Sequence, residues 1–123
     1  MSAFKKLVVD DVFLGDLMEL PKVLVFFGSR FGTLDLIQKF FSKLQFCHLR
    51  QVHGKTVVEA DPANKQEGDS HWTSQKNLAL TIISADCLPI LGLSDNHIFA
   101  VHAGWRGIRS NILSETLATV YGT

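Results

Sequence analysis

The sequence predicts an α+β fold in which a mixed β-sheet is flanked by helices. Apolar runs at residues 22–27, 78–83 and 88–93 are short and are bounded mostly by polar residues or proline, which is typical of buried strands. Apolar residues also recur at helical spacing at residues 34–44 and 108–120. One helix is therefore expected early in the chain and another at its end, with strands between them.

The N-terminal part is expected to form strands followed by a helix. Residues 7–9 are a candidate edge strand, and residues 22–27 form a second strand. Thr33 is placed to cap the helix, because its side-chain oxygen can accept a hydrogen bond from a free N–H group at the helix start. Asp35 in the first turn is favourable to the helix dipole. We therefore expect a helix over residues 34–44 with one side facing inward.

The middle of the chain is expected to form two strands around a histidine-containing turn. Residues 45–51 and 55–60 are the strands, and Val52-His53-Gly54 connects them. Residues 61–70 are polar and contain a proline and a glycine, so they are expected to form an exposed loop.

Reactive side chains follow the apolar runs of the C-terminal part. Asp86 and Cys87 come after the run at residues 78–83, and His102 follows a third run at residues 98–101. Sheet proteins commonly place their chemistry at the ends of buried strands. This part of the chain is therefore where a functional site is expected.

Length and composition predict one ordered domain that covers residues 1–123. Hydrophobic residues make up 46% of the chain, which favours a packed core over disorder. The 12 basic and 12 acidic residues give a net charge of zero, which argues against nucleic-acid and anionic membrane surfaces, because these require a basic excess. No apolar run approaches the roughly 20 residues of a membrane span, and the N-terminus lacks a signal-peptide pattern. We therefore expect a cytoplasmic protein.

Three residues that could bind a metal lie at predicted strand ends, namely His53, Cys87 and His102. Their separations are too long for a zinc-finger signature, so spacing alone does not define a metal site. Each residue also has a structural interpretation, since a cysteine can be a small buried hydrophobe and a turn histidine can bond to the backbone. The same residues also suit a cysteine nucleophile, with His102 as the base and Asp86 or another acid orienting the imidazole.

A turn before the final predicted helix is a candidate anion site. The turn consists of Gly104, Trp105, Arg106 and Gly107. Backbone N–H groups at a helix start and the guanidinium of Arg106 would bind an anion together. Ser29 and Arg30 are a second candidate contact. Either arginine could instead form a surface ion pair, and Trp105 could pack as a plug instead of stacking on a purine or sugar.

Three motifs stand in order along the chain, and together they strongly resemble those of the YfiH/YlmD-like family. They are Gln51-Val52-His53-Gly54, Ala85-Asp86-Cys87-Leu88-Pro89-Ile90 and Val101-His102-Ala103-Gly104-Trp105-Arg106-Gly107. Two further segments also resemble family segments, namely Gly68-Asp69-Ser70-His71-Trp72-Thr73 and Phe27-Gly28-Ser29-Arg30. The resemblance covers most of the chain.

The resemblance implies a YfiH-like fold and one zinc ion held by His53, Cys87 and His102. It also implies phosphorolysis of purine nucleosides such as adenosine, inosine and methylthioadenosine to free base and ribose 1-phosphate, with adenosine deamination as a second activity. The purine nucleoside and phosphate would then be the ligands.

Roles for the remaining candidate residues follow from this chemistry. Arg106, Arg30 and the backbone of residues 104–107 would hold phosphate in line with the glycosidic carbon. Asp86 would orient a ligand or a water molecule.

The chain departs from the family in two places. Between Arg30 and Gln51 the longer segment of the family is reduced to one helix, and family members continue well past the final helix. The chain thus resembles only the N-terminal half of the fold. Because a missing half would leave a sheet edge unpaired, we expect a homo-oligomer.

The older family label, multicopper polyphenol oxidase, can be judged by counting ligands. A cluster of several coppers needs more imidazoles than the five histidines of this chain can supply, whereas one zinc with three protein ligands and an open position fits. Two alternatives remain: a hydrolase with Cys87 as nucleophile and His102 as base, and a metal-binding fragment without activity.

Overall fold

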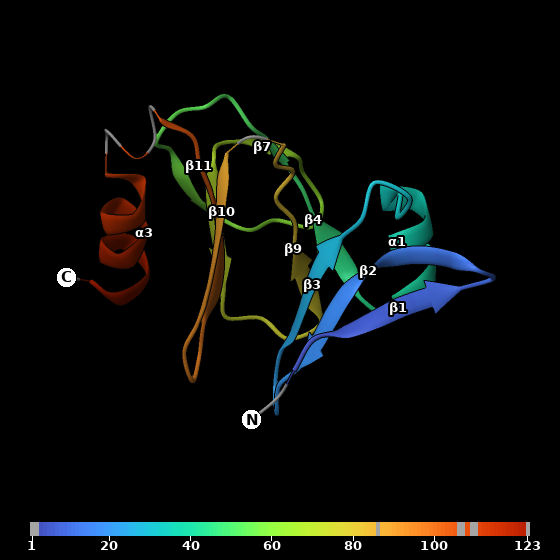
Figure 1. Ribbon diagram of the computed structural model, residues 1–123. Coiled ribbons are helices and arrows are strands. Elements are labelled where there is room, and N and C mark those ends of the chain that lie inside the picture. Colours follow the sequence, from blue (N-terminus) through green and yellow to red (C-terminus); the bar gives the residue numbers. More distant parts are fainter. Residues whose placement is uncertain (1–2, 86, 106–107, 109–110, 123) are drawn as a thin grey trace. The chain divides into compact units, whose positions relative to one another are not determined.

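The computed structural model describes residues 3–85, 87–105, 108 and 111–122. The chain divides into two compact units, Met1–Lys43 and Leu44–Thr123. Among the described residues, each unit contains strands and a helix, which confirms the predicted α+β class (Figure 1). In the described parts of the chain, no helix combines the length and the apolar character that crossing a membrane requires.

The first unit contains a three-stranded antiparallel sheet. Its strands are β1 (Lys5–Val9), β2 (Val12–Glu19) and β3 (Leu24–Gly28), in the order β1-β2-β3. The predicted edge strand at residues 7–9 and the strand at residues 22–27 are confirmed as β1 and β3. The strand β2 was not predicted. It follows a tight turn in which Asp10 and Asp11 have φ values of 51° and 64°. Left-handed residues of this kind form the two-residue connections of β-hairpins.

The first helix, α1 (Leu34–Phe40), follows the predicted cap. The Oγ1 atom of Thr33 accepts a hydrogen bond of 3.3 Å from the N–H group of Leu36. The helix ends before the predicted residue 44, because Phe41 leaves the helical conformation and its ring packs edge-on against Phe26 at 5.6 Å.

The second unit is built on a mixed four-stranded sheet, as predicted. Its order is β10-β11-β8-β6, and its strands are β6 (Val57–Glu59), β8 (Ser70–Thr73), β10 (Leu88–Leu93) and β11 (Ile98–Ala103). All neighbours are antiparallel except β6 and β8, which are parallel. The helix α3 (Ile112–Tyr121) packs on this sheet, and Ile112 joins Phe99, Val101 and Ala103 in the buried core (Figure 1).

Two short parallel strand pairs complete the second unit. They are β4 (Gln45–Cys47) with β9 (Leu78–Leu80), and β5 (Leu49–Arg50) with β7 (Gln66–Glu67). The predicted strand at residues 45–51 is therefore divided in two at His48. The prediction of an exposed loop at residues 61–70 was wrong for its last two residues, which are fully buried. Asp69 directly precedes the inner strand β8, and Ser70 is the first residue of that strand.

The final helix begins later than predicted. Asn111 has a left-handed φ of 59°, which right-handed helices exclude, so α3 begins at Ile112 and not at Ile108. The N–H group of Ile108 instead donates a hydrogen bond of 2.8 Å to the carbonyl oxygen of Gly104 and closes a separate turn.

Candidate metal centre

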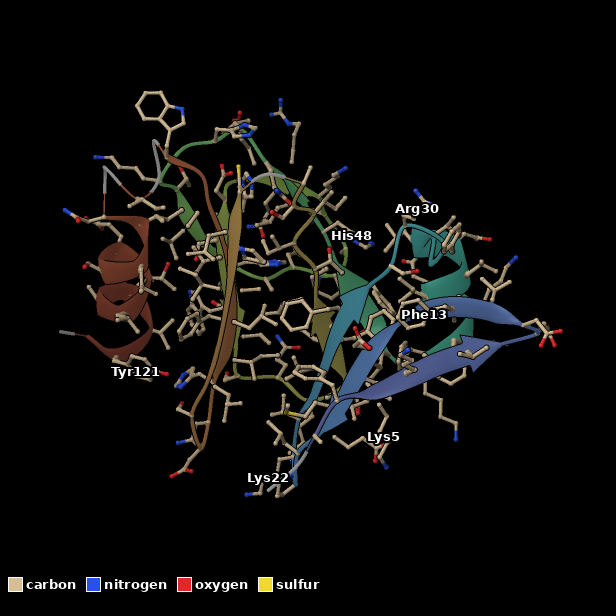
Figure 2. All side chains as sticks on the ribbon, in the orientation of Figure 1. Lys5, Phe13, Lys22, Arg30, His48 and Tyr121 are labelled. Carbon is tan, nitrogen blue, oxygen red and sulfur yellow. The ribbon has the colours of Figure 1, made fainter. Side chains whose placement is uncertain are left out.

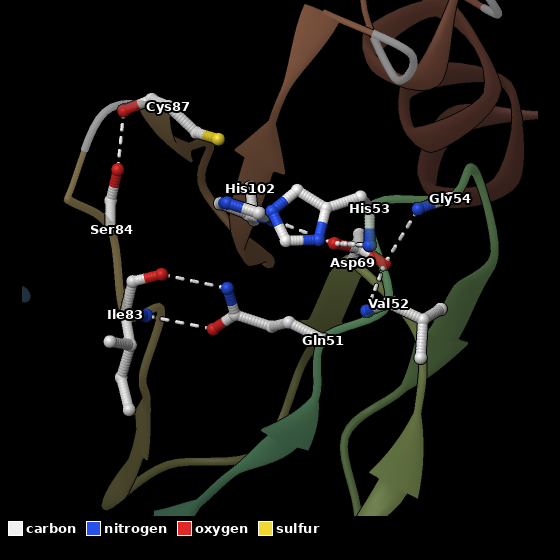
Figure 3. Close-up of polar contacts among 9 residues, drawn as sticks. All are labelled: Gln51, Val52, His53, Gly54, Asp69, Ile83, Ser84, Cys87 and His102. Atoms are coloured by element: carbon white, nitrogen blue, oxygen red, sulfur yellow. Dashed lines mark hydrogen bonds and ion pairs between the residues drawn. The ribbon is translucent and has the colours of Figure 1, made fainter.

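The three residues predicted as metal ligands lie together in the second unit (Figure 3). One ligand atom each of His53, Cys87 and His102 lies within 4.8 Å of the other two. The two imidazole rings meet edge to face with centroids 5.0 Å apart. A pair of imidazoles and one thiol is a donor set that zinc prefers.

The pairing of β10 with β11 brings two of these residues to the same end of the sheet. Leu88 pairs with Ala103, so Cys87, just before β10, comes opposite Gly104, which directly follows β11 and lies two residues after His102. A Cβ atom at Gly104 would lie 3.3 Å from Cys87 Sγ and 3.4 Å from His53 Cδ2. The missing side chain of Gly104 thus lets the backbone approach two of the candidate ligands closely.

His53 reaches the site from a loop held by one buried carboxylate. Oδ1 of Asp69 accepts hydrogen bonds of 3.0 Å from the N–H groups of Val52 and Gly54, and Oδ2 accepts one of 3.0 Å from the N–H group of His53. The same Oδ2 lies 2.7 Å from Nδ1 of His102 (Figure 3). One side chain therefore contacts two of the three candidate ligand residues.

Asp69 keeps its charge in this buried position. Burial alone raises the pKa of its carboxyl group, but the hydrogen bonds from His102 and from three backbone amides outweigh burial and hold the pKa below its usual 3.8. A carboxylate is thus present beside His102 at neutral pH.

The segment before Cys87 is fixed by a side-chain amide. Gln51 donates a hydrogen bond of 2.7 Å to the carbonyl oxygen of Ile83 and accepts one of 2.8 Å from the Ile83 N–H group. The Ser84 hydroxyl donates to the carbonyl oxygen of Cys87 (Figure 3). Gln51 belongs to the motif that contains His53, so this motif also holds the backbone of Ile83, four residues before Cys87.

The two cysteines lie in different environments. Cys87 is partly exposed beside the histidines, whereas Cys47 is 1% exposed and packs against Ala60 and Leu78. Burial raises the pKa of the Cys47 thiol, and the charge of Asp61 adds to this effect. Cys47 is therefore an inert core residue, and Cys87 is the thiol available for chemistry.

Three other predicted site residues, Ser29, Arg30 and Trp105, are not among the candidate metal ligands. The hydroxyl of Ser29 donates to the carbonyl oxygen of Phe13 and accepts from the N–H groups of Phe31 and Gly32, so it is occupied in building a turn of the first unit. The guanidinium of Arg30 lies 4.8 Å from the centroid of the Phe31 ring (Figure 2). Trp105 follows Gly104 and is 67% exposed.

Three predicted residues, Asp86, Arg106 and Gly107, lie outside the described residues. Asp69, in contrast, was not among the predicted site residues, because its segment was interpreted as the end of an exposed loop. The available signal was its place in a segment that resembles the Asp-containing segment of the family.

The chain is similar to proteins named as purine nucleoside phosphorylases. Residues 34–122 match the family model described as "Multi-copper polyphenol oxidoreductase laccase". A purine nucleoside phosphorylase of Pseudomonas aeruginosa, PA4543, is 46% identical over 71 residues, which are 56% of this chain and 29% of that protein. Purine nucleoside phosphorylase YfiH of Escherichia coli is 34% identical over 74 residues, which are 57% of this chain and 30% of that protein.

A solved structure has the same fold over part of its length. The crystal structure of Neisseria meningitidis protein NMB0706 matches with a TM-score of 0.63 and 26% sequence identity, covering 88% of this chain and 42% of that chain. The chain thus spans less than half of the length of each of these three proteins.

Proposed function

The chain belongs to the family described as multi-copper polyphenol oxidoreductase laccases, and we propose that it is a zinc-dependent purine nucleoside enzyme of the cytoplasm. It is similar to YfiH of Escherichia coli, in agreement with the resemblance of its motifs to the YfiH/YlmD-like family. The proposed reaction is phosphorolysis of adenosine, inosine or methylthioadenosine. The convergence of His53, Cys87 and His102 is the observation that carries this proposal. The names of the relatives supply the substrate class.

The donor set suits one zinc ion better than a cluster of coppers. Two imidazoles and a thiolate leave the fourth position of a tetrahedral zinc open. The other histidines have different surroundings: His48 and His71 contact Thr81, and the ring of His97 contacts Trp72 and Tyr121. When bound, zinc would supply Lewis acidity at its open position.

The chain's own residues would bind and orient the two substrates. In phosphorolysis a phosphate oxygen forms a bond to C1′ of the ribose while the bond from C1′ to the purine nitrogen breaks, and the purine leaves with the electron pair and takes up a proton. We propose that Arg106 and the backbone of residues 104–107 hold the phosphate, with Arg30 as a second contact. Trp105, with its exposed ring, is the candidate for stacking on the purine. Asp86 stays the sequence-based candidate for orienting a ligand or water.

Deamination of adenosine is the proposed second activity. Water would add to C6 of the purine and ammonia would leave, so the same base-binding position would serve both reactions. His53, Cys87 and His102 would hold the zinc, which would supply Lewis acidity for this reaction.

The geometry also supports one alternative. Asp69, His102 and Cys87 form the sequence acid, base and thiol that a cysteine nucleophile uses. Iodoacetamide separates the two functions: a zinc-bound Cys87 should react slowly until a chelator is added, whereas a free nucleophile should react at once.

Metal content tests the proposed cofactor. We expect about one zinc per chain in the purified protein, and we expect Cys87→Ala to lose it while Cys47→Ala keeps it. Because losing only a hydrogen-bond partner of a ligand costs about 10- to 100-fold in affinity, losing a ligand should cost more. Elemental analysis after dialysis measures the ratio. Full zinc in Cys87→Ala would contradict the proposed ligand set.

A product assay tests the reaction. Zinc-loaded protein is incubated with adenosine or inosine, with and without phosphate, and free base, ribose 1-phosphate and inosine are measured. Arg106→Ala should weaken the dependence on phosphate without removing zinc, and Arg106→Lys should restore it only in part, since a lysine lacks the two-pronged guanidinium. A zinc-loaded protein that releases neither free base nor inosine under any condition would leave only the inactive metal-binding alternative.

A further inference from the structure

We propose that Asp69 is a positioning residue for the metal, because it fixes the tautomer of His102 and the backbone of His53 at the same time. This inference rests on the proposed function only in requiring that the site binds zinc; it does not require phosphorolysis. Asp69 is fully buried and directly precedes β8, the inner strand between β6 and β11.

The contact with His102 determines which ring nitrogen can bind metal. An ionised carboxylate only accepts hydrogen bonds, so at 2.7 Å from Oδ2 of Asp69 the Nδ1 atom of His102 must carry a proton. Nε2 then keeps its lone pair for the metal. The carbonyl oxygen of Asp69 also accepts a hydrogen bond of 2.7 Å from the N–H group of His102, which holds the backbone of the same residue.

The contacts with the loop hold the second histidine in an unfavourable conformation. His53 has a φ of 61°, a left-handed value that residues with a Cβ atom rarely adopt. The carboxylate of Asp69 accepts the N–H groups of Val52, His53 and Gly54, each at 3.0 Å, and these three bonds offset the strain of the turn. The imidazole of His53 is thereby directed to the side where His102 and Cys87 lie (Figure 3).

Replacing Asp69 by asparagine should therefore disturb both ligands although its shape is kept. Each carboxylate oxygen of Asp69 accepts two hydrogen bonds. In asparagine an NH₂ group replaces one of these oxygens, and this group then faces N–H donors from which it cannot accept. If the NH₂ group faces His102, Nδ1 must accept, and the proton moves to Nε2, where it blocks the metal. If it faces Val52 and Gly54, the turn that displays His53 loses two bonds.

The test compares two variants of adjacent buried residues. Asp69→Asn changes the carboxylate, whereas Ser70→Ala removes the hydroxyl that contacts Thr116 on α3 and touches none of the candidate ligands. Zinc affinity is measured by competition with a chelator. We expect Asp69→Asn to bind zinc about 10- to 100-fold more weakly than wild type, and Ser70→Ala to bind within about twofold.

A second measurement reports the tautomer of His102 itself, first in the wild-type protein. Nitrogen-15 NMR of the imidazoles in zinc-free wild-type protein should show His102, assigned by its loss in His102→Gln, with the proton on Nδ1. In folded Asp69→Asn, molecules whose NH₂ group faces His102 should carry the proton on Nε2, so the population should shift toward that tautomer. Such a shift is a signature that a merely structural role for Asp69 would not produce.

The outcomes separate this inference from the proposed activity. A wild-type His102 with its proton on Nε2, or equal zinc affinities in Asp69→Asn and Ser70→Ala, would overturn the role of Asp69. Zinc binding that falls as expected in Asp69→Asn, in a protein that phosphorolyses no nucleoside, would support the role of Asp69 and contradict the activity. A wild-type protein that binds no zinc would overturn both.

Discussion

His71 on β8 shows what burial does to a single histidine. The side chain is fully buried, and its Nε2 atom donates a hydrogen bond of 3.0 Å to the carbonyl oxygen of Thr81. Its Nδ1 atom has no hydrogen-bond partner among the described residues. Burial lowers the pKa of His71 to about 4, and neighbouring His48 adds a smaller effect in the same direction. The folded protein therefore requires His71 to be neutral.

We predict that His71 makes folding sensitive to acid below pH 6.5. The unfolded chain takes up a proton near its ordinary pKa of 6.5, whereas the folded chain resists protonation down to about 4. Stability is therefore complete above pH 6.5 and is lost as the pH falls toward 4, by about 3 kcal/mol in total. Urea unfolding of wild type and His71→Gln at several pH values measures this.

Glutamine is the matched variant because it can donate to Thr81 but does not titrate. Other acid-sensitive groups, such as Asp69, stay in both proteins and cancel in the difference. The free energies of unfolding of the two proteins should therefore converge as the pH falls. A constant difference between pH 7 and pH 4 would contradict the prediction.

At the scale of elements, a pair of buried hydroxyls joins α3 to the sheet. The Oγ atom of Ser70 on β8 lies 2.7 Å from Oγ1 of Thr116 on α3, and Thr116 donates in turn to the carbonyl oxygen of Ile112 at 2.8 Å. Since Thr116 uses its proton for Ile112, the hydroxyl of Ser70 is the donor between the two side chains. Both side chains are fully buried.

A double-mutant cycle should detect this connection. Thr116→Val leaves the Ser70 hydroxyl buried without an acceptor, so we expect a loss of about 1 to 3 kcal/mol in the free energy of unfolding. Ser70→Ala should cost about 1 kcal/mol, because Thr116 still donates to Ile112. The double variant should be more stable than the sum of the single losses predicts, by about 1 kcal/mol. Additive losses in denaturant titrations would show that the two hydroxyls are independent.

At the scale of the whole molecule, the open edge of β10 has exposed apolar side chains. Within the described residues, β11 is the strand that pairs with β10, so its other edge is unpaired. At the connection of the two strands, the N–H group of Ser94 donates to the carbonyl oxygen of His97. In an antiparallel pair, every second residue directs its backbone N–H and C=O groups toward the partner strand. Counting back from Ser94, the backbone groups of Pro89, Leu91 and Leu93 therefore point away from β11. Pro89 has no N–H group, so the edge offers two donors and three carbonyl oxygens for another strand.

We predict that the chain forms dimers or larger oligomers at micromolar concentration through this edge. Leu91 and Leu93 are 40% and 51% exposed, and pairing with a second copy would bury both together with the free backbone groups. Leu93→Lys should lower the average mass in light scattering, because a charge at the edge opposes pairing. Leu113→Lys, at an exposed position of α3, is the control and should leave the mass unchanged. A wild-type monomer across the concentration range would contradict the prediction.

Local patterns in the sequence were sufficient for several elements. Alternation and bounded apolar runs predicted β1, β3 and β10, and the cap at Thr33 predicted the start of α1. These features depend on neighbouring residues: a side-chain oxygen next to free N–H groups, or an apolar run of strand length. The sequence by itself was also sufficient to identify the family and the three candidate ligands. Both follow from the order of the motifs along the chain, which can be read without knowing how close the residues lie in the fold.

Only the tertiary structure decided how these pieces act together. Polar Ser70 and His71 belong to a strand because β6 and β11 pair with it on both sides, and a local pattern cannot show this pairing. Asp69 became a central residue because a buried charge requires donors, and its donors come from distant parts of the chain. Gly54, His53 and Val52 lie 15 to 17 positions before it, and His102 lies 33 positions after it. The sequence thus determined which residues could bind a metal, and the packing of distant segments around one carboxylate decided how they are held.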